Sequence, residues 1–151
     1  MVSEKQIYGP IEIKIFDHEL YPIPLAPSHP GEWIDLKAAK NMMLEKGAYA
    51  EIPLGVAMRL PRNTEAHIVP RSSTFKNYHI MMAGSVGIID NSYSGDTDEW
   101  MFPAVATKST IIEKGTRICQ FRLFPVQGKV EFVQVNQLDD VGRGGLGSTG
   151  R

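Results

Sequence analysis

Short runs in which apolar and polar residues alternate recur along the whole chain. Residues 11–16 place isoleucine at every second position between polar residues, which is the pattern of a strand with one buried face. Many short strands separated by glycine and proline indicate a sandwich or a barrel, so we predict an all-β fold. The further predicted strands are 50–60 (strand, turn, strand), 65–69, 99–106, 111–112, 117–124 and 130–135.

Two stretches do not follow this alternation. Residues 38–46 have the composition of a helix, although the stretch is short and runs directly into Gly47. Prolines at positions 22, 24, 27 and 30 predict an extended, irregular segment. No tandem repeat or second domain is apparent in the 151 residues, a length that normally forms one domain.

The composition narrows the classes of partner. The chain is 42% hydrophobic and 22% charged, as in ordinary soluble proteins. Its formal net charge is -1, so no nucleic-acid partner is expected. No apolar run approaches the ~20 residues that cross a bilayer, and no signal-like segment opens the chain, so we expect a cytoplasmic protein without membrane contact. The single cysteine, Cys119, lies in an apolar strand and is expected to be buried and unreactive.

The stretch 87–96 is the first candidate for chemistry. β-branched residues lead into Asp90, and the small polar residues after it favour a turn, so Asp90 and Tyr93 are predicted at the bend of a hairpin. The carboxylate is a candidate general base, and the ring is a candidate platform for a ligand. An ordinary turn with Tyr93 packed beside it is the alternative.

Two further stretches carry hydrogen-bond donors suited to phosphate. Arg71 can pair with two phosphate oxygens and Ser72 can donate a hydroxyl, although both residues also suit a solvated turn. Residues 141–151 hold five of the 14 glycines, whose backbone N–H groups can converge on an anion unless the tail is simply disordered. Arg143, Ser148, Thr149 and Arg151 add side-chain donors there.

Five polar or glycine-bearing stretches occur in order between residues 31 and 150. They read Gly31-Glu-Trp-Ile-Asp35-Leu, Pro70-Arg71-Ser72-Ser73, Gly87-Ile-Ile-Asp90-Asn-Ser-Tyr93-Ser-Gly95, Lys114-Gly115-Thr-Arg117-Ile-Cys-Gln120 and Gly144-Gly145-Leu146-Gly147-Ser148-Thr149-Gly150. Each stretch alone is weak evidence. Together they resemble the five ordered motifs of the trimeric dUTP pyrophosphatases (dUTPases).

The resemblance implies a distorted β jelly roll assembled as a homotrimer. Each active site would be built from more than one subunit. Residues 1–138 would form the β domain, and residues 139–151 would be a flexible, glycine-rich arm that closes the site.

The resemblance also implies hydrolysis of dUTP to dUMP and pyrophosphate, with Mg2+ held mainly by the substrate phosphates. Asp90 matches the general base that deprotonates the water attacking the alpha phosphorus. Gln120 matches a glutamine that helps to fix this water, unless its amide only bonds to backbone. Asp35 matches a carboxylate that supports the site, through metal-bound water or through a turn or ion pair.

Further matched positions would bind the substrate. Tyr93 matches a ring that packs under deoxyribose and excludes a 2'-hydroxyl, and backbone groups of residues 84–89 would read uracil. The substrate-binding residues that the resemblance implies are Arg71, Ser72, Ser73, Gly84, Gly87, Ile88, Ile89, Tyr93, Arg143, Leu146, Gly147, Ser148 and Thr149.

The chain departs from the family pattern at three positions. Gly84 stands where many bacterial relatives carry Asn, and Asp96 stands where Glu is usual. Leu146 replaces the aromatic residue that closes over uracil. We expect either that Leu146 caps the base by apolar contact or that a nearby aromatic such as Trp100 takes over.

Two other functions are alternatives. The dCTP deaminases share Arg-Ser-Ser, but they need a glutamate where this chain has Trp100, and Glu99 is expected on the opposite face of the strand. A regulatory role in binding another protein is the second alternative, since a fold does not fix a function. The four histidines are widely spaced and no cysteines are paired, so a metalloenzyme with its own His or Cys site is not expected.

Overall fold

The computed structural model describes residues 9–21, 25–26, 31–139, 141–146 and 150. These residues form β-strands and one short α-helix, so the all-β prediction is confirmed. None of the helices in this described part is long and apolar enough to cross a membrane. The elements are β1 (Glu12–Ile15), β2 (Ile34–Lys37), β3 (Met42–Leu44), β4 (Tyr49–Pro53), β5 (Val56–Arg59), β6 (Thr64–Pro70), α1 (Thr74–Tyr78), β7 (Ile80–Met82), β8 (Gly87–Ile89), β9 (Met101–Ala106), β10 (Thr110–Ile112) and β11 (Arg117–Pro125).

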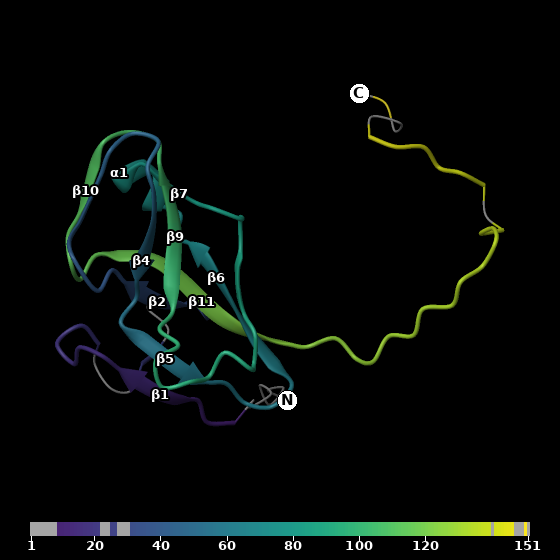
Figure 1. Cartoon of the computed structure of the whole chain (residues 1–151), viewed down its shortest axis with the longest axis horizontal. Helices are drawn as coiled ribbons and strands as arrows, with labels where there is room; N and C mark the ends of the chain where they lie inside the picture. The colour runs from purple at the N-terminus through teal and green to yellow at the C-terminus, as the bar shows by residue number, and fades with distance from the viewer. Residues whose placement is uncertain (1–8, 22–24, 27–30, 140, 147–149, 151) are drawn as a thin grey trace.

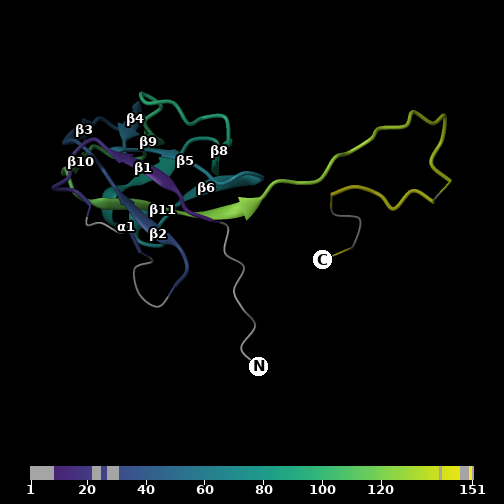
Figure 2. The same ribbon diagram turned by 90° about the horizontal axis from the view of Figure 1, so that it is seen from below.

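Strands from distant parts of the chain pair into antiparallel sheets. The largest sheet has the order β2-β11-β6-β8, and a second has the order β4-β9-β7. Two smaller sheets pair β1 with β5 and β3 with β10. β11 is paired on both sides, so that Gln120 lies opposite Asp35 of β2 and Val69 of β6. Figures 1 and 2 show that these sheets form one body, from which the C-terminal segment leads away.

The core joins the inward faces of the two larger sheets. Trp100 and Phe121 are fully buried and meet edge to face, with ring centroids 5.1 Å apart. In β9 every second residue is buried, as the alternation in the sequence requires. Cys119 is buried as predicted, and this burial raises the pKa of its thiol. The strands expected at 11–16, 50–60, 65–69, 99–106, 111–112 and 117–124 are confirmed.

The helix predicted at 38–46 is wrong. β3 occupies this stretch and pairs with β10, which places Met43 opposite Ile111. The side-chain oxygen of Asn41 also accepts the backbone N–H of Lys114 at 2.7 Å. Cross-strand pairing therefore outweighs the local helix propensity.

The strand predicted at 130–135 is also wrong. Residues 126–139 contain no helix or strand and run as an extended segment away from the body (Figures 1 and 2). Phe132 is 92% exposed, and none of the described strands pairs with this segment. The alternating pattern is present, but a single strand without a partner is not stable. We call residues 126–139 the arm segment.

The bend after Asp90 connects two sheets. β8 pairs with β6, whereas β9 pairs with β4 and β7. The predicted turn at Asp90 is confirmed, but the predicted hairpin is wrong, because each strand beside the turn finds its partner elsewhere. We call residues 90–100 the connecting loop.

Candidate active site

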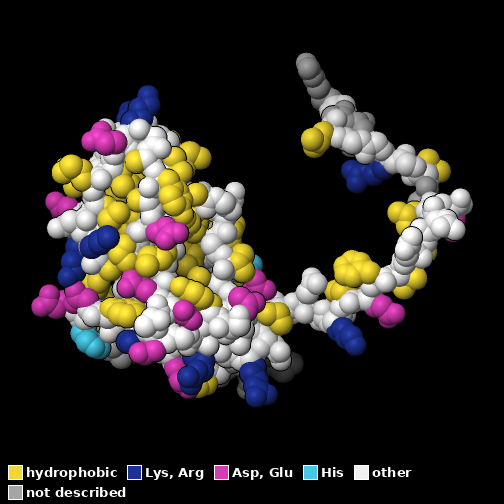
Figure 3. Space-filling view, viewed as in Figure 1, with side chains coloured by type: hydrophobic (Ala, Val, Ile, Leu, Met, Phe, Trp, Pro, Cys, Tyr) yellow, Lys and Arg dark blue, Asp and Glu magenta, His cyan; other side chains and the backbone are white. Residues whose placement is uncertain are grey.

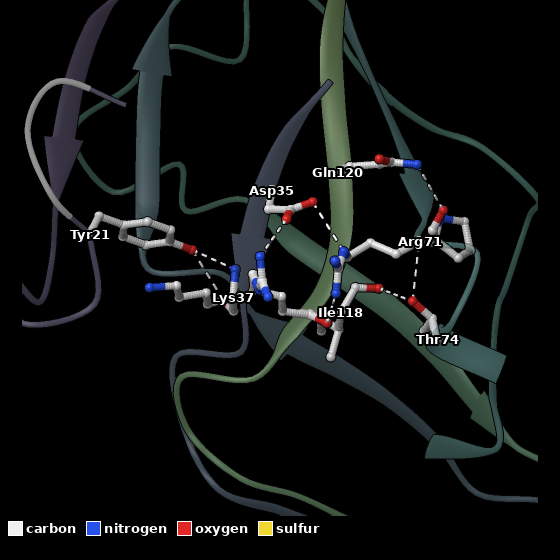
Figure 4. Close-up of polar contacts among 9 residues, drawn as sticks. Tyr21, Asp35, Lys37, Arg71, Thr74, Ile118 and Gln120 are labelled. Atoms are coloured by element: carbon white, nitrogen blue, oxygen red, sulfur yellow. Dashed lines mark hydrogen bonds and ion pairs between the residues drawn. The ribbon is translucent and has the colours of Figure 1, made fainter. Parts of the chain in front are cut away.

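Three strands bring Asp35, Arg71 and Gln120 together. Asp35 lies on β2 and Gln120 lies opposite it on β11, while Arg71 directly follows β6 on the other side of β11. Figure 4 shows the three side chains grouped at this place. The buried Tyr21 hydroxyl accepts the Lys37 N–H at 2.8 Å (Figure 4). It also donates to the Leu54 carbonyl at 2.6 Å, and the two bonds fix the end of β2.

The Asp35 carboxylate orients two guanidinium groups. Its side chain is only 10% exposed, and its two oxygens lie 3.1 Å from Nε of Arg71 and 3.3 Å from Nη1 of Arg117. Nη1 of Arg71 also donates to the Arg117 carbonyl at 3.5 Å. A guanidinium carries five N–H donors in one plane, so a group held on one edge can still present N–H groups in the geometry that matches phosphate oxygens. The arrangement is therefore suited to bind a polyphosphate.

A buried threonine fixes the backbone that carries Arg71. Thr74 Oγ1 accepts the Arg71 N–H at 2.9 Å and donates to the Ile118 carbonyl at 2.7 Å (Figure 4). The Arg71 turn is thereby tied to β11. Ser72 is exposed, and Ser73 begins α1 without a side-chain capping bond. Both serines directly follow Arg71 in the sequence, where phosphate donors were expected.

Gln120 is held from the opposite strand. Its Nε2 donates to the Pro70 carbonyl at 3.4 Å, and the side chain is half-buried (Figure 4). One amide hydrogen and the amide oxygen are available for a ligand or a water.

Asp90 forms the first turn of the connecting loop. Its Oδ1 accepts the Ser92 N–H at 2.8 Å and the Ser92 hydroxyl at 2.5 Å. The hydroxyl bond first, and the backbone bond second, lower the pKa of Asp90 below its ordinary value, because they stabilise the charged form. Asp90 is exposed and therefore presents an ionised carboxylate at neutral pH.

Tyr93 lies three residues further along, 40% exposed, with its hydroxyl donating to the Glu99 carbonyl at 3.1 Å. Partial burial, together with the charges of Asp98 and Glu99, raises the pKa of its phenol, which stays neutral. On the other side of Asp90, Gly84 adopts φ 80°, and a Cβ on Gly87 would lie 2.8 Å from Met82. Between Gly87 and Asp90, Ile88 is exposed and Ile89 is half-buried.

The two groups of residues lie at opposite ends of β6. Ile89 pairs with Ala66, so Asp90 continues to the level of Glu65, whereas Arg71 follows the other end. With about 3.3 Å of rise per residue, the six steps from Glu65 to Arg71 span roughly 20 Å. The structure therefore brings Asp35, Arg71 and Gln120 together but leaves Asp90 and Tyr93 apart from them within one chain.

The C-terminal residues do not complete the site within one chain. Arg143 and Leu146 are exposed and belong to the C-terminal segment that leads away from the body (Figure 1). Gly147, Ser148 and Thr149 lie outside the described residues.

The expectation that Trp100 closes over the base is wrong. Its ring has no exposed surface and packs against Phe121 in the core. A side chain in this position cannot reach a ligand. Of the two residues considered for this role, Leu146 remains.

Three residues of the site were missed by sequence reasoning. Arg117 lies inside a quoted motif, but its ion pair with Asp35 depends on the pairing of β2 with β11. Nothing in the sequence indicated the role of Thr74 apart from its position after two serines. Asn91 donates to the carbonyls of Pro61 and Thr64, and an asparagine beside a candidate base was the available clue.

Several known proteins resemble this chain in sequence. A family model described as dUTPase matches residues 27–150. The SPbeta prophage-derived deoxyuridine 5'-triphosphate nucleotidohydrolase YosS of Bacillus subtilis is 51% identical over 120 residues, covering 80% of this chain and 84% of that protein. The corresponding protein of Rickettsia prowazekii is 33% identical over 144 residues, covering 93% of this chain and 96% of that protein.

Solved dUTPase structures share the fold. A dUTPase of Staphylococcus phage 80alpha matches with a TM-score of 0.77 at 20% identity, covering 94% of this chain and 99% of that chain. A dUTPase of Staphylococcus aureus phage phi11 matches with a TM-score of 0.71 at 16% identity, covering 87% and 100%. The jelly-roll fold implied by the five motifs is thus confirmed. The chain belongs to the dUTPase family.

Proposed function

We propose that the protein hydrolyses dUTP to dUMP and pyrophosphate. The observation that carries this proposal is the pair of guanidinium groups that Asp35 holds beside Gln120, in a chain of the dUTPase family. Oriented cations suit the triphosphate, whose negative charge must be stabilised as the bond to the leaving pyrophosphate breaks.

Asp90 is proposed as the general base. A carboxylate with a lowered pKa is ionised at neutral pH and can accept a proton from water. The water oxygen forms a bond to the alpha phosphorus, the bond from this phosphorus to the bridging oxygen breaks, and pyrophosphate leaves. Asp90 takes the proton of the water. Gln120 is proposed to orient the same water through its free amide groups.

Mg2+ is proposed to enter with the substrate. Among the described residues, no group of three or more His, Cys, Asp or Glu could hold a metal ion, which fits an ion held mainly by the phosphates. The Asp35 oxygens contact two arginines, which favours an orienting role for this carboxylate. Its contact with Mg2+ through water stays a prediction. A structural Mg(II) ion is described in the dUTPase of phage phi11.

A homotrimer with shared sites is proposed for three reasons. Asp90 and Arg71 lie at opposite ends of β6, so one chain does not unite them. The arm segment exposes Phe132, Val133 and Leu138, which need a partner to be covered. The outward face of the β4-β9-β7 sheet is apolar, with Tyr49, Met81 and Met101 exposed. Figure 3 shows hydrophobic side chains gathered on the face of the body where β9 and β10 lie.

The nucleoside is proposed to lie on the segment around Asp90. Tyr93 would pack under the deoxyribose, and the backbone of residues 84–89 would read uracil. In a neighbouring copy, the glycine-rich residues 139–151, with Arg143, Ser148 and Thr149, would close over the phosphates, and Leu146 would cap the base. The exposure of Arg143 and Leu146 supports this assignment, because the body of their own chain does not engage them.

The test is pyrophosphate release from dUTP, dCTP, dTTP and UTP with Mg2+. We expect release from dUTP alone and its loss in Asp90→Asn, which keeps the shape of the side chain but cannot accept the proton. Release of ammonia from dCTP, without pyrophosphate, would instead assign a deaminase. No reaction with any of the four nucleotides would refute the proposed hydrolysis.

A regulatory protein partner stays an additional prediction. The structural work on the dUTPase of Staphylococcus phage 80alpha states that phage dUTPases control transfer of virulence genes. Asp90→Asn would separate the two roles, because this variant should lose pyrophosphate release but keep its binding to a protein partner.

A further inference from the structure

Side-chain hydrogen bonds tie the connecting loop to the body on each side of Tyr93. Asn91 ties its beginning to the turn between β5 and β6, and Lys14 of β1 ties Asp96 near its middle. These ties come from side chains that the proposed reaction does not use. Each tie lies close to a different functional group of the loop.

The Asn91 tie adjoins the proposed base. The half-buried Nδ2 donates to the Pro61 carbonyl at 2.6 Å and to the Thr64 carbonyl at 3.1 Å, with the Leu60 carbonyl at 3.4 Å. Both amide hydrogens are thus directed at backbone oxygens, a role that a carboxylate cannot fill. Because Asp90 is the preceding residue, this side chain fixes the backbone from which the carboxylate projects.

The Lys14 tie lies beyond Tyr93. Its Nζ donates to the Asp96 carbonyl at 3.0 Å and lies 2.9 Å from Asp96 Oδ1. The ammonium is also 5.0 Å from the centre of the Phe16 ring, which restrains the lysine. An Asp98 oxygen accepts the Gly95 N–H at 2.7 Å, and the Asp98 N–H donates to the Gly95 carbonyl at 3.1 Å, so the turn 95–98 that contains Asp96 is closed.

The Lys14 tie is not required by general stability alone. The Lys14 and Asp96 side chains are 44% and 85% exposed, and ion pairs of this kind contribute little to the free energy of unfolding. If Lys14 had only a structural role, its replacement would therefore leave both stability and kinetics nearly unchanged. A positioning role predicts instead a change in substrate binding.

We propose that Asn91 and Lys14 are positioning residues for two different parts of the reaction. Asn91 holds Asp90 in place for the attack of water. Lys14, through Asp96, holds the turn that presents Tyr93 to the sugar. This inference rests on the proposed function of Asp90 and Tyr93.

The Asn91 arm of the test compares Asn91→Ala and Asn91→Asp with Thr64→Val. Thr64 Oγ1 donates to the Pro61 carbonyl within the same turn, so Thr64→Val removes this bond but keeps both backbone carbonyls that accept from Asn91. We expect both Asn91 variants to lower kcat by about 100-fold with KM within about twofold, since a misplaced catalytic group is costly. Thr64→Val should lower Tm and keep kcat. An Asn91→Ala protein that loses Tm but keeps kcat would overturn this assignment.

The Lys14 arm compares Lys14→Met and Lys14→Arg with Arg59→Met. Arg59 of β5 pairs with Glu12 of β1 at 2.8 Å, and this ion pair joins the two strands without including the connecting loop, which makes Arg59 the matched control. We expect Lys14→Met to raise KM for dUTP about fivefold, with kcat near wild type. The preference of the enzyme for dUTP over UTP should also decrease. Lys14→Arg should restore both. Equal kinetics for Lys14→Met and Arg59→Met would refute the role of Lys14.

Asp90→Asn and Tyr93→Ala are measured in the same assay. If these two variants keep full activity and selectivity, the proposed function itself fails. If they lose them while the Asn91 and Lys14 variants behave like their controls, only the positioning inference fails.

Discussion

Ser92 donates two hydrogen bonds to one carboxylate oxygen of Asp90, from its backbone N–H and from its hydroxyl. The pair closes the turn and holds the carboxylate in its charged form. A base with a lowered pKa stays ionised into acidic solution, so we predict that this contact sets the acid limit of the proposed reaction.

The first prediction concerns this acid limit. Activity requires ionised Asp90 and is lost as pH falls through its pKa. Ser92→Ala removes the hydroxyl bond, which lowers the pKa more than the backbone bond does, so the acid limb of kcat should move to higher pH. A kcat profile from about pH 4 to pH 8 measures this shift. Ser109→Ala, which removes a surface bond to Glu45, is the control and should not move the limb. An unmoved limb in Ser92→Ala would argue that another group sets it.

The second prediction concerns Asp35. Asp35→Asn keeps the volume but removes the charge that holds Arg71 and Arg117, so KM for dUTP should rise about tenfold or more. Asp17→Asn is the matched control, because Asp17 pairs with Lys114 outside the site and should leave KM unchanged. If Asp35 acts chiefly through Mg2+, raising the metal concentration should rescue Asp35→Asn; the orienting role predicts no rescue.

The third prediction separates Trp100 from Leu146. Trp100→Ala empties a fully buried position and should lower the free energy of unfolding by about 3–5 kcal/mol. Leu146→Ala should leave this free energy unchanged, because the side chain is fully exposed, and should raise KM for dUTP. Urea denaturation and steady-state kinetics on both variants measure the two effects. A Leu146→Ala protein with unchanged KM would remove Leu146 as the cap.

The fourth prediction concerns the apolar face. Met81 lies opposite Val105 and in the same row as Tyr49, so Met81→Glu places a charge in the proposed subunit contact. We expect sedimentation to show monomers and dUTP hydrolysis to fall by about 100-fold or more. Lys46→Glu, an exposed change elsewhere, should remain trimeric and active. An active Met81→Glu monomer would contradict shared sites.

The alternation of apolar and polar residues predicted strands correctly where one face of the strand packs against the core of the same chain. The alternation in 11–16 and 99–106 reports a buried face, and both became strands. The same alternation in 130–135 did not, because none of the strands in the described part of the chain pairs with it. The sequence of 38–46 favours a helix locally, and only the pairing of Met43 with Ile111 explains the strand.

The candidate site was predictable in its residues but not in its geometry. Asp35, Arg71, Gln120 and Asp90 could be named from their motifs. The ion pair of Arg117 with Asp35 joins residues 82 positions apart, so it depends on the register of β2 with β11. The separation of Asp90 from Arg71 likewise follows from strand order, which local sequence does not reveal.

The central claim is that Asp90 of one subunit acts on a substrate held by Arg71 of another. Mixing Asp90→Asn with Arg71→Ala, unfolding both and refolding them together tests it most directly. Each variant alone should be inactive, and the mixture should regain about a quarter of wild-type activity, because some sites then receive both intact residues from different chains. A mixture as inactive as its parents, although mixed trimers form, would contradict the claim.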